Sequence, residues 1–389
     1  MNQFITALRT LRPRNIVEAK NIARQARTAA DSLRTDVTEV RRWLKELRSR
    51  DSRDRETQTR MLQQIAERLD TLEQATRQQQ DALLKEMASL THEVATLRVR
   101  ESQLRAIARQ DCRLEPHLAA LDSTLSDPAI GTHVRQAIAR STLHLEPFPH
   151  IVVDKLLPRH VFDALITGLP PSALFADRAP NKQQLNVPFD VASVYSQRIW
   201  QFMARTIGPE FIMPAIVEVF RESMHQWLRQ TLPQVTPAQI DALALTCSDG
   251  RILLRRPGYR IPPHRDPKWG FITCLMYLPR HGDDQRWGTH LYSVAAARET
   301  EAKGAAPHWI SDDDCTLVST VEFVPNRTLF FLNSHGAHGA DIPADAEPAT
   351  LERYAYQFRV GPAADTIRGL LELLPEERLP YWKGKATHY

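Results

Sequence analysis

Cysteine is scarce and unpaired in this 389-residue sequence, which holds only Cys112, Cys247, Cys274 and Cys315 and no C-x-x-C pair. This spacing excludes a disulfide-stapled domain and a zinc ribbon, and it predicts reduced thiols in a cytoplasmic protein. No stretch approaches the roughly 18 consecutive apolar residues that a membrane span needs, and no apolar signal-peptide core follows Met1. The formal net charge is only +4, so no global basic field favours nucleic acid as a partner.

The first third of the chain lacks helix breakers. No glycine occurs before Gly131, and Pro13 is the only proline before Pro116. Phe4 and Trp43 are the only aromatic residues in this stretch, in which Arg, Gln, Glu, Ala and Leu are abundant. Such a composition is typical of long helices.

Apolar residues in this stretch repeat with heptad spacing. Steps of four and three residues connect two series, Leu33, Val37, Val40, Leu44 and Leu47, and later Leu83, Met87, Leu90, Val94 and Leu97. A shorter series lies between them, so the register slips near residues 51–57 and 76–80. We predict a coiled coil over residues 16–110 that makes the protein a homo-oligomer. An intramolecular helical hairpin is the alternative.

Two further segments flank the predicted coiled coil. Residues 1–15 form a basic amphipathic start, which can lie on an anionic membrane surface, here at the inner face of the membrane. A frayed helix end is the alternative interpretation. Residues 111–145 still have helical character but are broken by prolines and a glycine, so we expect a helical linker there.

The character of the chain changes at Pro147, and we assign residues 146–389 to a second domain. Helices are expected over residues 158–168, 191–207, 210–232 and 365–374, with a polar, proline-bearing loop over residues 170–188. Seven short strands separated by Gly/Pro turns follow Leu243. That pattern indicates a β-sandwich or double-sheet jelly roll with its core at about residues 246–362. The whole chain is therefore expected to be of the α+β class.

A histidine and an aspartate, both common metal ligands in proteins, precede the apolar run 271–278. His264 and Asp266 stand two apart, and in an extended chain such residues point to the same face. One imidazole and one carboxylate supply two thirds of the 2-His-1-carboxylate triad that holds non-haem Fe(II). The later segment N-S-H-G-A-H-G-A-D offers the third ligand, as His335 or His338.

A second H-x-D pair competes with the first. His281 and Asp283 lie in the polar segment R-H-G-D-D-Q-R, after a predicted strand has ended. Because no apolar strand follows to fix their positions, we favour His264 and Asp266.

Five segments follow one another along the chain in this order: R-P-G-Y-R-I-P-P-H-R-D, I-T-C-L-M-Y-L-P, W-G-T-H-L-Y, N-R-T-L-F-F-L-N-S-H-G-A-H-G-A and R-Y-A-Y-Q-F. Over about residues 147–361 this order resembles the Fe(II)/2-oxoglutarate dioxygenases, and more narrowly their prolyl 4-hydroxylase-like branch. The resemblance implies a double-stranded β-helix (jelly-roll) oxygenase domain with flanking helices. It also implies Fe(II), 2-oxoglutarate and O₂ as cofactor and co-substrates, with ascorbate as an optional reductant.

The resemblance assigns site residues one by one. His264, Asp266 and His338 match the family's catalytic metal ligands. Arg353, in R-Y-A, falls where the family places the arginine that grips the distal carboxylate of 2-oxoglutarate, a task suited to its planar fork. Arg359 is the alternative, six residues further along the same strand face.

Three other positions concern the co-substrate pocket. Thr273 and Tyr277 alternate on one face of a strand, where family members place a hydroxyl toward the co-substrate, and core packing is the alternative. Ala355 stands where the family has a serine, which removes one hydroxyl from the pocket.

The sequence thus favours a dioxygenase that hydroxylates a substrate with release of succinate and CO₂. A non-catalytic jelly-roll and coiled-coil scaffold is the alternative. A halogenase is disfavoured, because that chemistry needs a small residue in place of Asp266. The substrate class is left open between a peptidyl side chain and a saccharide or small molecule.

Overall fold

The computed structural model describes residues 28, 34–46, 55–175, 179–279, 285–295, 308–374, 376 and 379–382. The fold divides into two units, residues 1–97 and 98–389. Predictions made for residues 1–15 and for His281 and Asp283 lie outside the described residues. Among the described residues, no helix combines the length and the apolar character needed to cross a membrane.

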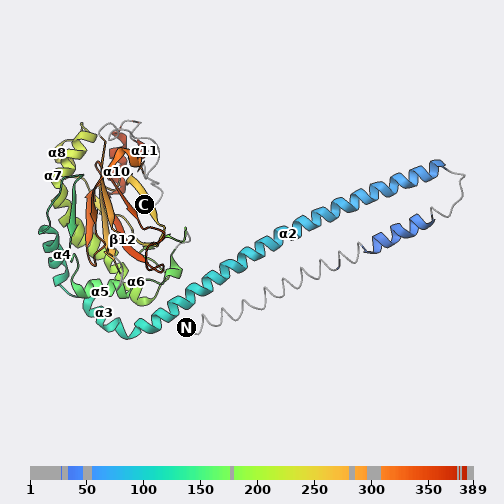
Figure 1. The fold of residues 1–389 in the computed structure, drawn as a ribbon, viewed down its shortest axis with the longest axis horizontal. Helices are drawn as coiled ribbons and strands as arrows, with labels where there is room; N and C mark the ends of the chain where they lie inside the picture. The colour runs from blue at the N-terminus through green and yellow to red at the C-terminus, as the bar shows by residue number, and fades with distance from the viewer. Residues whose placement is uncertain are drawn as a thin grey trace. The chain divides into compact units, whose positions relative to one another are not determined.

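The first unit is helical wherever it is described. One helix covers residues 34–46. The next, α2 (Arg55–Leu114), is 60 residues long, begins in the first unit and ends in the second (Figure 1). The guanidinium of Arg68 lies 5.9 Å from the ring centre of Trp43, and Ile65 is only 8% exposed. The contact of Arg68 with Trp43 joins the two helical segments within one chain, as the hairpin alternative expects. The predicted long helix is therefore present, and a coiled coil between chains stays a prediction.

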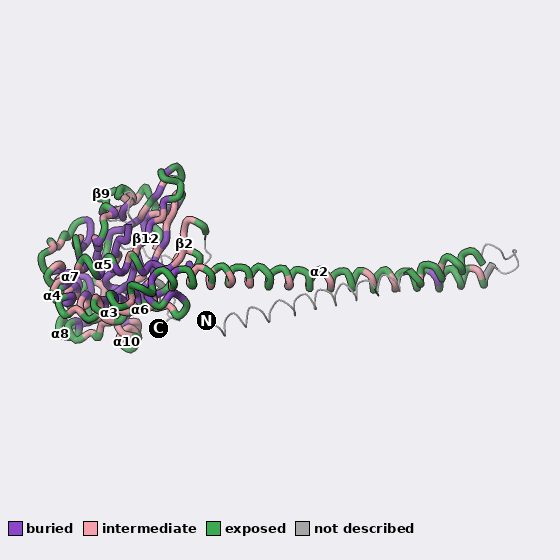
Figure 2. Tube along the Cα trace, turned by 90° about the horizontal axis from the view of Figure 1, so that it is seen from below, coloured by how far each residue is buried: buried purple, intermediate pink, exposed green. Residues whose placement is uncertain are grey.

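Part of the predicted heptad seam of α2 is exposed in the single chain, while Leu83, Leu90 and Leu97 are half-buried. Leu62 is 54% exposed, Met87 59% and Val94 41%. Figure 2 shows the same contrast, with the long part of α2 mostly exposed and the buried residues gathered in the second unit. Apolar side chains at these positions gain little from burial within the chain, so their free energy of burial is available to a partner helix.

The segment predicted as a helical linker packs into the second unit. Beyond the end of α2 it forms η1 (Glu115–His117), α3 (Leu118–Leu125) and α4 (Ala129–Ala139). It contributes five fully buried side chains to the main core: Leu114, Leu121, Ile130, Val134 and Ile138.

Two antiparallel sheets form the centre of the second unit. The larger, seven-stranded sheet has the order β1-β10-β6-β12-β4-β2, and β3 pairs with β12 beside β4. Its strands are β1 (His150–Val153), β2 (Lys182–Val187), β3 (Leu245–Cys247), β4 (Gly250–Arg255), β6 (Ile272–Leu278), β10 (Thr328–Leu332) and β12 (Arg353–Pro362).

The smaller, five-stranded sheet has the order β8-β5-β11-β7-β9. Its strands are β5 (Arg260–Arg265), β7 (Thr289–Val294), β8 (His308–Trp309), β9 (Cys315–Val321) and β11 (Ala337–Asp341). Two antiparallel sheets of this kind agree with the predicted jelly roll.

Helices pack on the outer face of the larger sheet (Figure 1). They are α5 (Arg159–Thr167), α6 (Val194–Phe202), η3 (Met203–Ile212) and α7 (Met213–Thr231), with the shorter η2 (Ser172–Leu174), α8 (Pro237–Asp241), α10 (Ala364–Glu372) and α11 (Leu379–Trp382) nearby and η4 (Asp312–Asp314) before β9. η3 is a π-helix that contains Pro209, a residue without the N–H that an α-helix requires. The predicted helices at 158–168, 191–207, 210–232 and 365–374 are thus present.

Alternation along the strands separates a helix-covered face from a face that meets the other sheet. In β4, Ile252 and Leu254 are fully buried under the helices, while Arg251, Leu253 and Arg255, which alternate with them, are half-buried. The predicted loop over residues 170–188 was wrong in its second half, because residues 182–187 form β2. That strand is polar and lies at the edge of the sheet, so it lacks the apolar alternation by which strands are recognised.

Candidate metal centre

The pairing of β5 with β11 brings the predicted metal ligands together. His264 on β5 and His338 on β11 are direct cross-strand partners, and their ring centres lie 4.2 Å apart. Asp266 follows His264 by two residues, just after β5 ends. Ligand atoms of the three side chains all lie within 4.8 Å of one another, and each residue is at most 8% exposed.

Two glycines allow His338 to reach this position. Gly336 adopts a φ of +73°, and a Cβ there would lie 2.2 Å from the ring of Phe148. A Cβ on Gly339 would lie 2.8 Å from the carbonyl oxygen of Ile261, at the register shift that follows His338 in β11. Gly336 is therefore required by its positive φ and by the Phe148 ring, and Gly339 by the close approach of the β5 backbone.

Backbone contacts and burial prepare the imidazoles to accept a metal. Nδ1 of His264 lies 2.9 Å from the carbonyl oxygen of Pro262, so that nitrogen donates a proton and Nε2 keeps its lone pair. Nε2 in turn lies 4.0 Å from Oδ1 of Asp266. Burial lowers the pKa of His264 and lowers the pKa of His338 to about 3. Both rings are therefore neutral near pH 7, as metal ligands must be.

The carboxylate of Asp266 is held by two neighbours. Thr273 donates its hydroxyl to Oδ2 at 2.8 Å, while Arg359 places Nε 3.3 Å from Oδ2 and Nη2 2.8 Å from Oδ1. Burial alone would raise the pKa of Asp266, but the charge of Arg359, with smaller contributions from His338 and His264, holds it well below its usual range. Asn333 supports this arrangement by donating its amide to the Thr273 hydroxyl at 2.9 Å.

Arg353 and Tyr277 lie together in a second cluster between the sheets. The guanidinium of Arg353 lies 3.6 Å from the ring centre of Phe323, and the residue is 4% exposed. Tyr277 donates its hydroxyl to Oγ1 of Thr289 at 2.8 Å. Burial raises the pKa of Tyr277 to about 12, and the nearby charge of Arg353 offsets part of that rise. A cation and a neutral phenol hydroxyl in one buried place suit a carboxylate ligand.

Strand register explains why these residues share one face. In the pairing of β12 with β6, Arg359 lies opposite Thr273 and Ala355 lies opposite Tyr277. Arg353, two residues before Ala355, therefore also faces the smaller sheet. The two arginines that the sequence left as alternatives lie on the same face but have different partners.

Two other candidates differ in their relation to the centre. His335 is exposed and is not part of the cluster of ligand atoms. Thr273 contacts the centre by donating to Asp266, and its predicted role toward the co-substrate stays a prediction. Sequence reasoning missed Asn333, Thr289 and Trp309, whose ring centre lies 5.3 Å from that of His264. Only Asn333 had a signal, because it opens the N-S-H-G segment.

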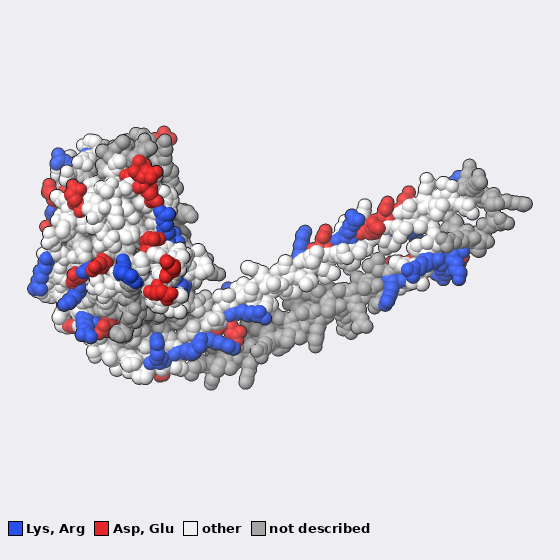
Figure 3. Space-filling view, viewed as in Figure 1, with Lys and Arg blue, Asp and Glu red and all other residues white. Residues whose placement is uncertain are grey.

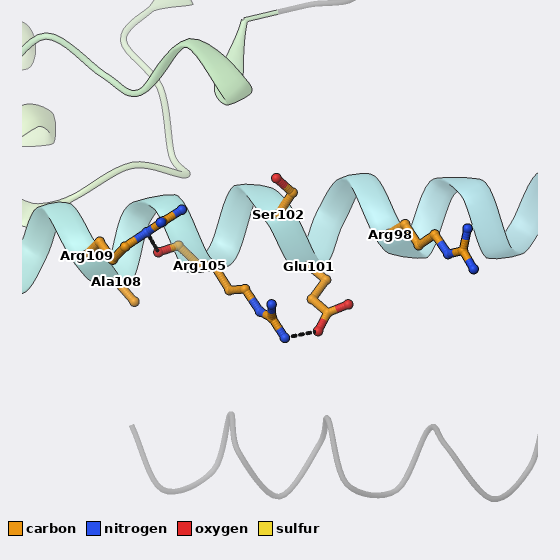
Figure 4. Close-up of a pocket in the computed structure, with 6 residues that line it drawn as sticks. All are labelled: Arg98, Glu101, Ser102, Arg105, Ala108 and Arg109. Carbon is orange, nitrogen blue, oxygen red and sulfur yellow. Dashed lines mark hydrogen bonds and ion pairs between the residues drawn. The ribbon is translucent and has the colours of Figure 1, made fainter.

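A surface hollow lies elsewhere, beside α2. Six residues line it: Arg98, Glu101, Ser102, Arg105, Ala108 and Arg109 (Figure 4). Arg105 and Glu101 form an ion pair at 2.7 Å along the helix. Exposed pairs of this spacing stabilise a helix by only a few tenths of a kcal/mol, so we assign this hollow no function.

No protein-family model matches the sequence, and no curated protein matches it either. Solved structures do match, including non-haem α-ketoglutarate-dependent enzymes and prolyl 4-hydroxylases. The epimerase SnoN from nogalamycin biosynthesis is 13% identical with a TM-score of 0.35, and the match covers 61% of this chain and 85% of SnoN.

Two further matches have similar values. HygX from Streptomyces hygroscopicus, solved with nickel and 2-oxoglutarate, is 13% identical with a TM-score of 0.36, covering 55% of this chain and 83% of HygX. A Pseudomonas putida prolyl-4-hydroxylase is 13% identical with a TM-score of 0.30, covering 60% of this chain and all of that enzyme. The family named from the sequence recurs among these matches, but likeness at this level says nothing about substrate, so function has to come from this chain's own residues.

Proposed function

We propose that this protein is an Fe(II)- and 2-oxoglutarate-dependent dioxygenase that hydroxylates a substrate C–H bond and releases succinate and CO₂. The observation that carries the proposal is the buried convergence of His264, Asp266 and His338, with ligand atoms within 4.8 Å. Two imidazoles and one carboxylate form the facial triad of non-haem iron oxygenases.

The donor set fits the metal. Two neutral imidazoles and an ionised carboxylate would supply three ligands to Fe(II) and would leave its other positions open for reactants, as in the facial triad of non-haem iron oxygenases. Arg359 and Thr273 occupy part of the Asp266 carboxylate, but a carboxylate has about four acceptor sites, so Oδ1 keeps room for a metal.

A bound Fe(II) supplies the redox chemistry that couples decarboxylation of 2-oxoglutarate to oxygen insertion. The residues of the chain hold and orient the reactants. His264, Asp266 and His338 fix the metal, while Arg359 and Thr273 keep Asp266 ionised and aimed.

The second cluster receives the far end of the co-substrate. Arg353, beside the Tyr277 hydroxyl, binds the distal carboxylate of 2-oxoglutarate. Phe148, Leu291 and Phe331 pack in a buried apolar cluster next to Tyr277 and exclude water from this part of the pocket.

The proposal also includes assembly of a homo-oligomer through the first unit. Two apolar seam residues of α2, Met87 and Val94, are exposed in one chain, which supports assembly of a homo-oligomer through a coiled coil. The double variant Met87→Glu with Val94→Glu should shift the protein to a smaller species in sedimentation velocity. Leu84→Glu is the matched control, because Leu84 is exposed but off the seam. Equal sedimentation of all three proteins would contradict this part.

The metal site is tested by anaerobic titration of the apoprotein with Fe(II) and 2-oxoglutarate, following the visible charge-transfer band of the chelate. We expect a band that saturates at about one iron per chain and is absent in Asp266→Ala, because the variant loses a charged ligand. His335→Ala, which changes an exposed histidine, should keep the band. A folded, metal-free protein that gives no band would favour the non-catalytic scaffold instead.

A further inference from the structure

An exposed tryptophan lies beside the candidate metal centre. Trp309 on β8 is 51% exposed, and its ring centre lies 5.3 Å from that of the buried His264. The two residues are direct cross-strand partners, so their side chains share the face of the smaller sheet that carries the proposed ligand His338 as well. One part of the indole therefore covers a proposed ligand, and the rest is open to solvent.

The exposure of Trp309 sets it apart from tryptophans that stabilise the fold. Trp200, Trp227 and Trp382 are at most 8% exposed. A large apolar ring that stays in water gains free energy when a ligand covers it, and an indole presents a broad flat face for such a contact. The position of Trp309 beside His264 therefore indicates a binding surface for the substrate of the proposed reaction.

The backbone of Trp309 is open as well. In an antiparallel pair, residues that exchange hydrogen bonds with the partner strand alternate with residues whose N–H and C=O point away from it. Ile310 donates its N–H to the carbonyl oxygen of Pro263 on β5, so Trp309, one residue earlier, points its N–H and C=O away from β5. β8 is the last strand at this edge of the sheet in the described part of the chain. Neither backbone group of Trp309 has a hydrogen-bond partner among the described residues.

An unpaired N–H and C=O on an edge strand complement the backbone of an extended peptide, which can add to the sheet as a further strand. A peptide that pairs with Trp309 would lie about 5 Å from β8 and about 10 Å from β5. Its side chain opposite Trp309 would share the face of the indole and of His264. Strand addition at this edge therefore brings peptide side chains to the side of the sheet on which the proposed ligands lie.

The chemistry of this edge favours a neutral peptide segment. Acidic and basic side chains mingle over the side of the second unit that Figure 3 shows, so on that side charge does not single out a docking surface. Trp309 offers an apolar ring and two uncharged backbone groups. A saccharide can stack on an indole, but its hydroxyl groups do not reproduce the alternating N–H and C=O of an extended backbone.

The other edge of the smaller sheet is less suitable. β9 is also exposed there, with Leu317 at 52% and Val318 at 51%. However, β7 and β11 separate this strand from β5, and its pairing with β7 contains a register shift next to Leu317. Bulges of this kind protect edge strands from pairing with another chain. The edge at β9 therefore serves as a comparison for the edge at β8.

We propose that the substrate is an extended, uncharged peptide segment that pairs with the backbone of Trp309 at the edge of β8 and packs a side chain on the indole. This inference deepens the proposed function and rests on it, because the reaction at the metal centre makes the bound peptide a substrate. Backbone pairing supplies affinity for extended peptides in general, and the indole selects the side chain that lies against it.

The test begins with a random dodecapeptide phage library, selected on the full-length protein loaded with Ni(II) and 2-oxoglutarate. Enriched peptides are synthesised, and their affinities are measured by calorimetry. We expect Trp309→Ala to bind them about tenfold or more weakly, as is common for a tryptophan at the centre of an interface. Trp309→Phe keeps an aromatic ring and should restore part of this loss, and circular dichroism checks that both variants are folded.

The contribution of the backbone is tested on the peptide. Each enriched peptide is made in two further copies, methylated on the backbone nitrogens of its odd or of its even residues. Alternate N–H groups of a strand point to opposite sides, so one copy loses its donor to Trp309 and should bind about fivefold more weakly, while the other keeps its affinity. Equal affinities of the two copies would overturn the inference.

A control variant and a control ligand locate the contact. Leu317→Ala changes an exposed side chain at the other edge of the sheet and should leave peptide binding unchanged. Maltohexaose, a neutral saccharide, should bind more weakly than the enriched peptides. The inference is overturned if no selected peptide prefers the unsubstituted protein to Trp309→Ala, if Leu317→Ala weakens binding as much as Trp309→Ala does, or if maltohexaose binds more tightly than the peptides.

The two proposals fail separately. If the Fe(II) and 2-oxoglutarate band forms but no peptide binds through Trp309, only the substrate inference is overturned. If no band forms, the dioxygenase assignment fails, and the assignment of the peptide as its substrate fails with it.

Discussion

Two arginines on one strand show how environment assigns different tasks to the same side chain. Arg353 and Arg359 lie six residues apart on β12, face the same side and are each at most 9% exposed. Arg359 contacts both oxygens of the Asp266 carboxylate, so its charge is matched within the protein. Arg353 lies over the ring of Phe323 and beside the Tyr277 hydroxyl, an environment that a dianionic co-substrate complements. The proposed function accordingly gives Arg359, beside a carboxylate, the task of positioning a ligand residue, and gives Arg353, beside an aromatic ring, the task of binding the co-substrate.

The largest expected effect separates the two arginines directly. Arg353→Ala should weaken 2-oxoglutarate binding on the order of a hundredfold, because two charge-assisted hydrogen bonds are lost, while metal affinity changes little. Arg359→Ala should instead weaken metal binding, since Asp266 loses its main partner. Titrations of each variant with Fe(II), and then with 2-oxoglutarate, measure both affinities. If Arg359→Ala weakens the binding of 2-oxoglutarate and leaves metal affinity unchanged, the two arginines do not differ in the way described.

The region around Arg359 also contains a histidine that titrates far from its usual pH. Burial lowers the pKa of His338 to about 3, against 6.5 in an unfolded chain. Between these values the unfolded chain binds more protons, so the free energy of unfolding of the metal-free protein falls as pH drops from 6.5 toward 3, on the order of 1 kcal/mol per pH unit.

Urea denaturation of the metal-free protein at pH 7 and pH 5 checks this slope. His338→Gln should show a smaller difference between the two pH values than the unsubstituted protein. His335→Gln, at the exposed histidine, should keep the original difference. Identical slopes in all three proteins would show that His338 is not buried in its neutral form.

A smaller effect is expected at Thr273. Thr273→Val removes the hydroxyl that donates to Oδ2 of Asp266 but keeps the shape of the side chain and the contact of Arg359. Metal affinity should fall about fivefold to tenfold, the low end for a residue behind a ligand. Thr289→Val is a matched control, because Thr289 accepts from Tyr277 and should leave metal affinity unchanged. If 2-oxoglutarate affinity alone falls in Thr273→Val, the original expectation that Thr273 faces the co-substrate is right.

The smallest expected effect is at Tyr277. Tyr277→Phe removes one neutral hydroxyl beside Arg353, so 2-oxoglutarate binding should weaken about threefold with metal binding intact. Calorimetry with the metal-loaded protein measures this. A loss as large as that of Arg353→Ala would mean that the phenol, and not the guanidinium, dominates recognition of the co-substrate.

A residue of this centre could be predicted from the sequence only where the interaction that positions it is local along the chain. His264 and Asp266 were accessible because the two-residue period of a strand is local. The different tasks of Arg353 and Arg359 could not be predicted from the sequence. They depend on the register between β12 and β6, which places Arg359 opposite Thr273. Alternation along β12 says only that both arginines share a face.

The strand β2 was missed for a physical reason. With Gln183, Gln184 and Asn186, it carries polar side chains where a core strand would carry apolar ones. An apolar pattern reveals buried strands, such as β6 and β10, and does not reveal a polar strand at the edge of a sheet. The long helix α2 could be predicted because helix propensity depends on local composition. The partner that covers its apolar seam cannot be identified from that composition.

The direct pairing of His264 with His338 has a kinetic consequence. Because the two proposed ligands lie on hydrogen-bonded neighbouring strands, their spacing is set by the ladder between β5 and β11 and not by loops that fluctuate independently. Exchange of the metal then requires either rotation of a ligand side chain or local opening of that ladder. Amide hydrogen exchange at Ile261 and Ala340, which pair in this ladder, should therefore slow when the metal binds.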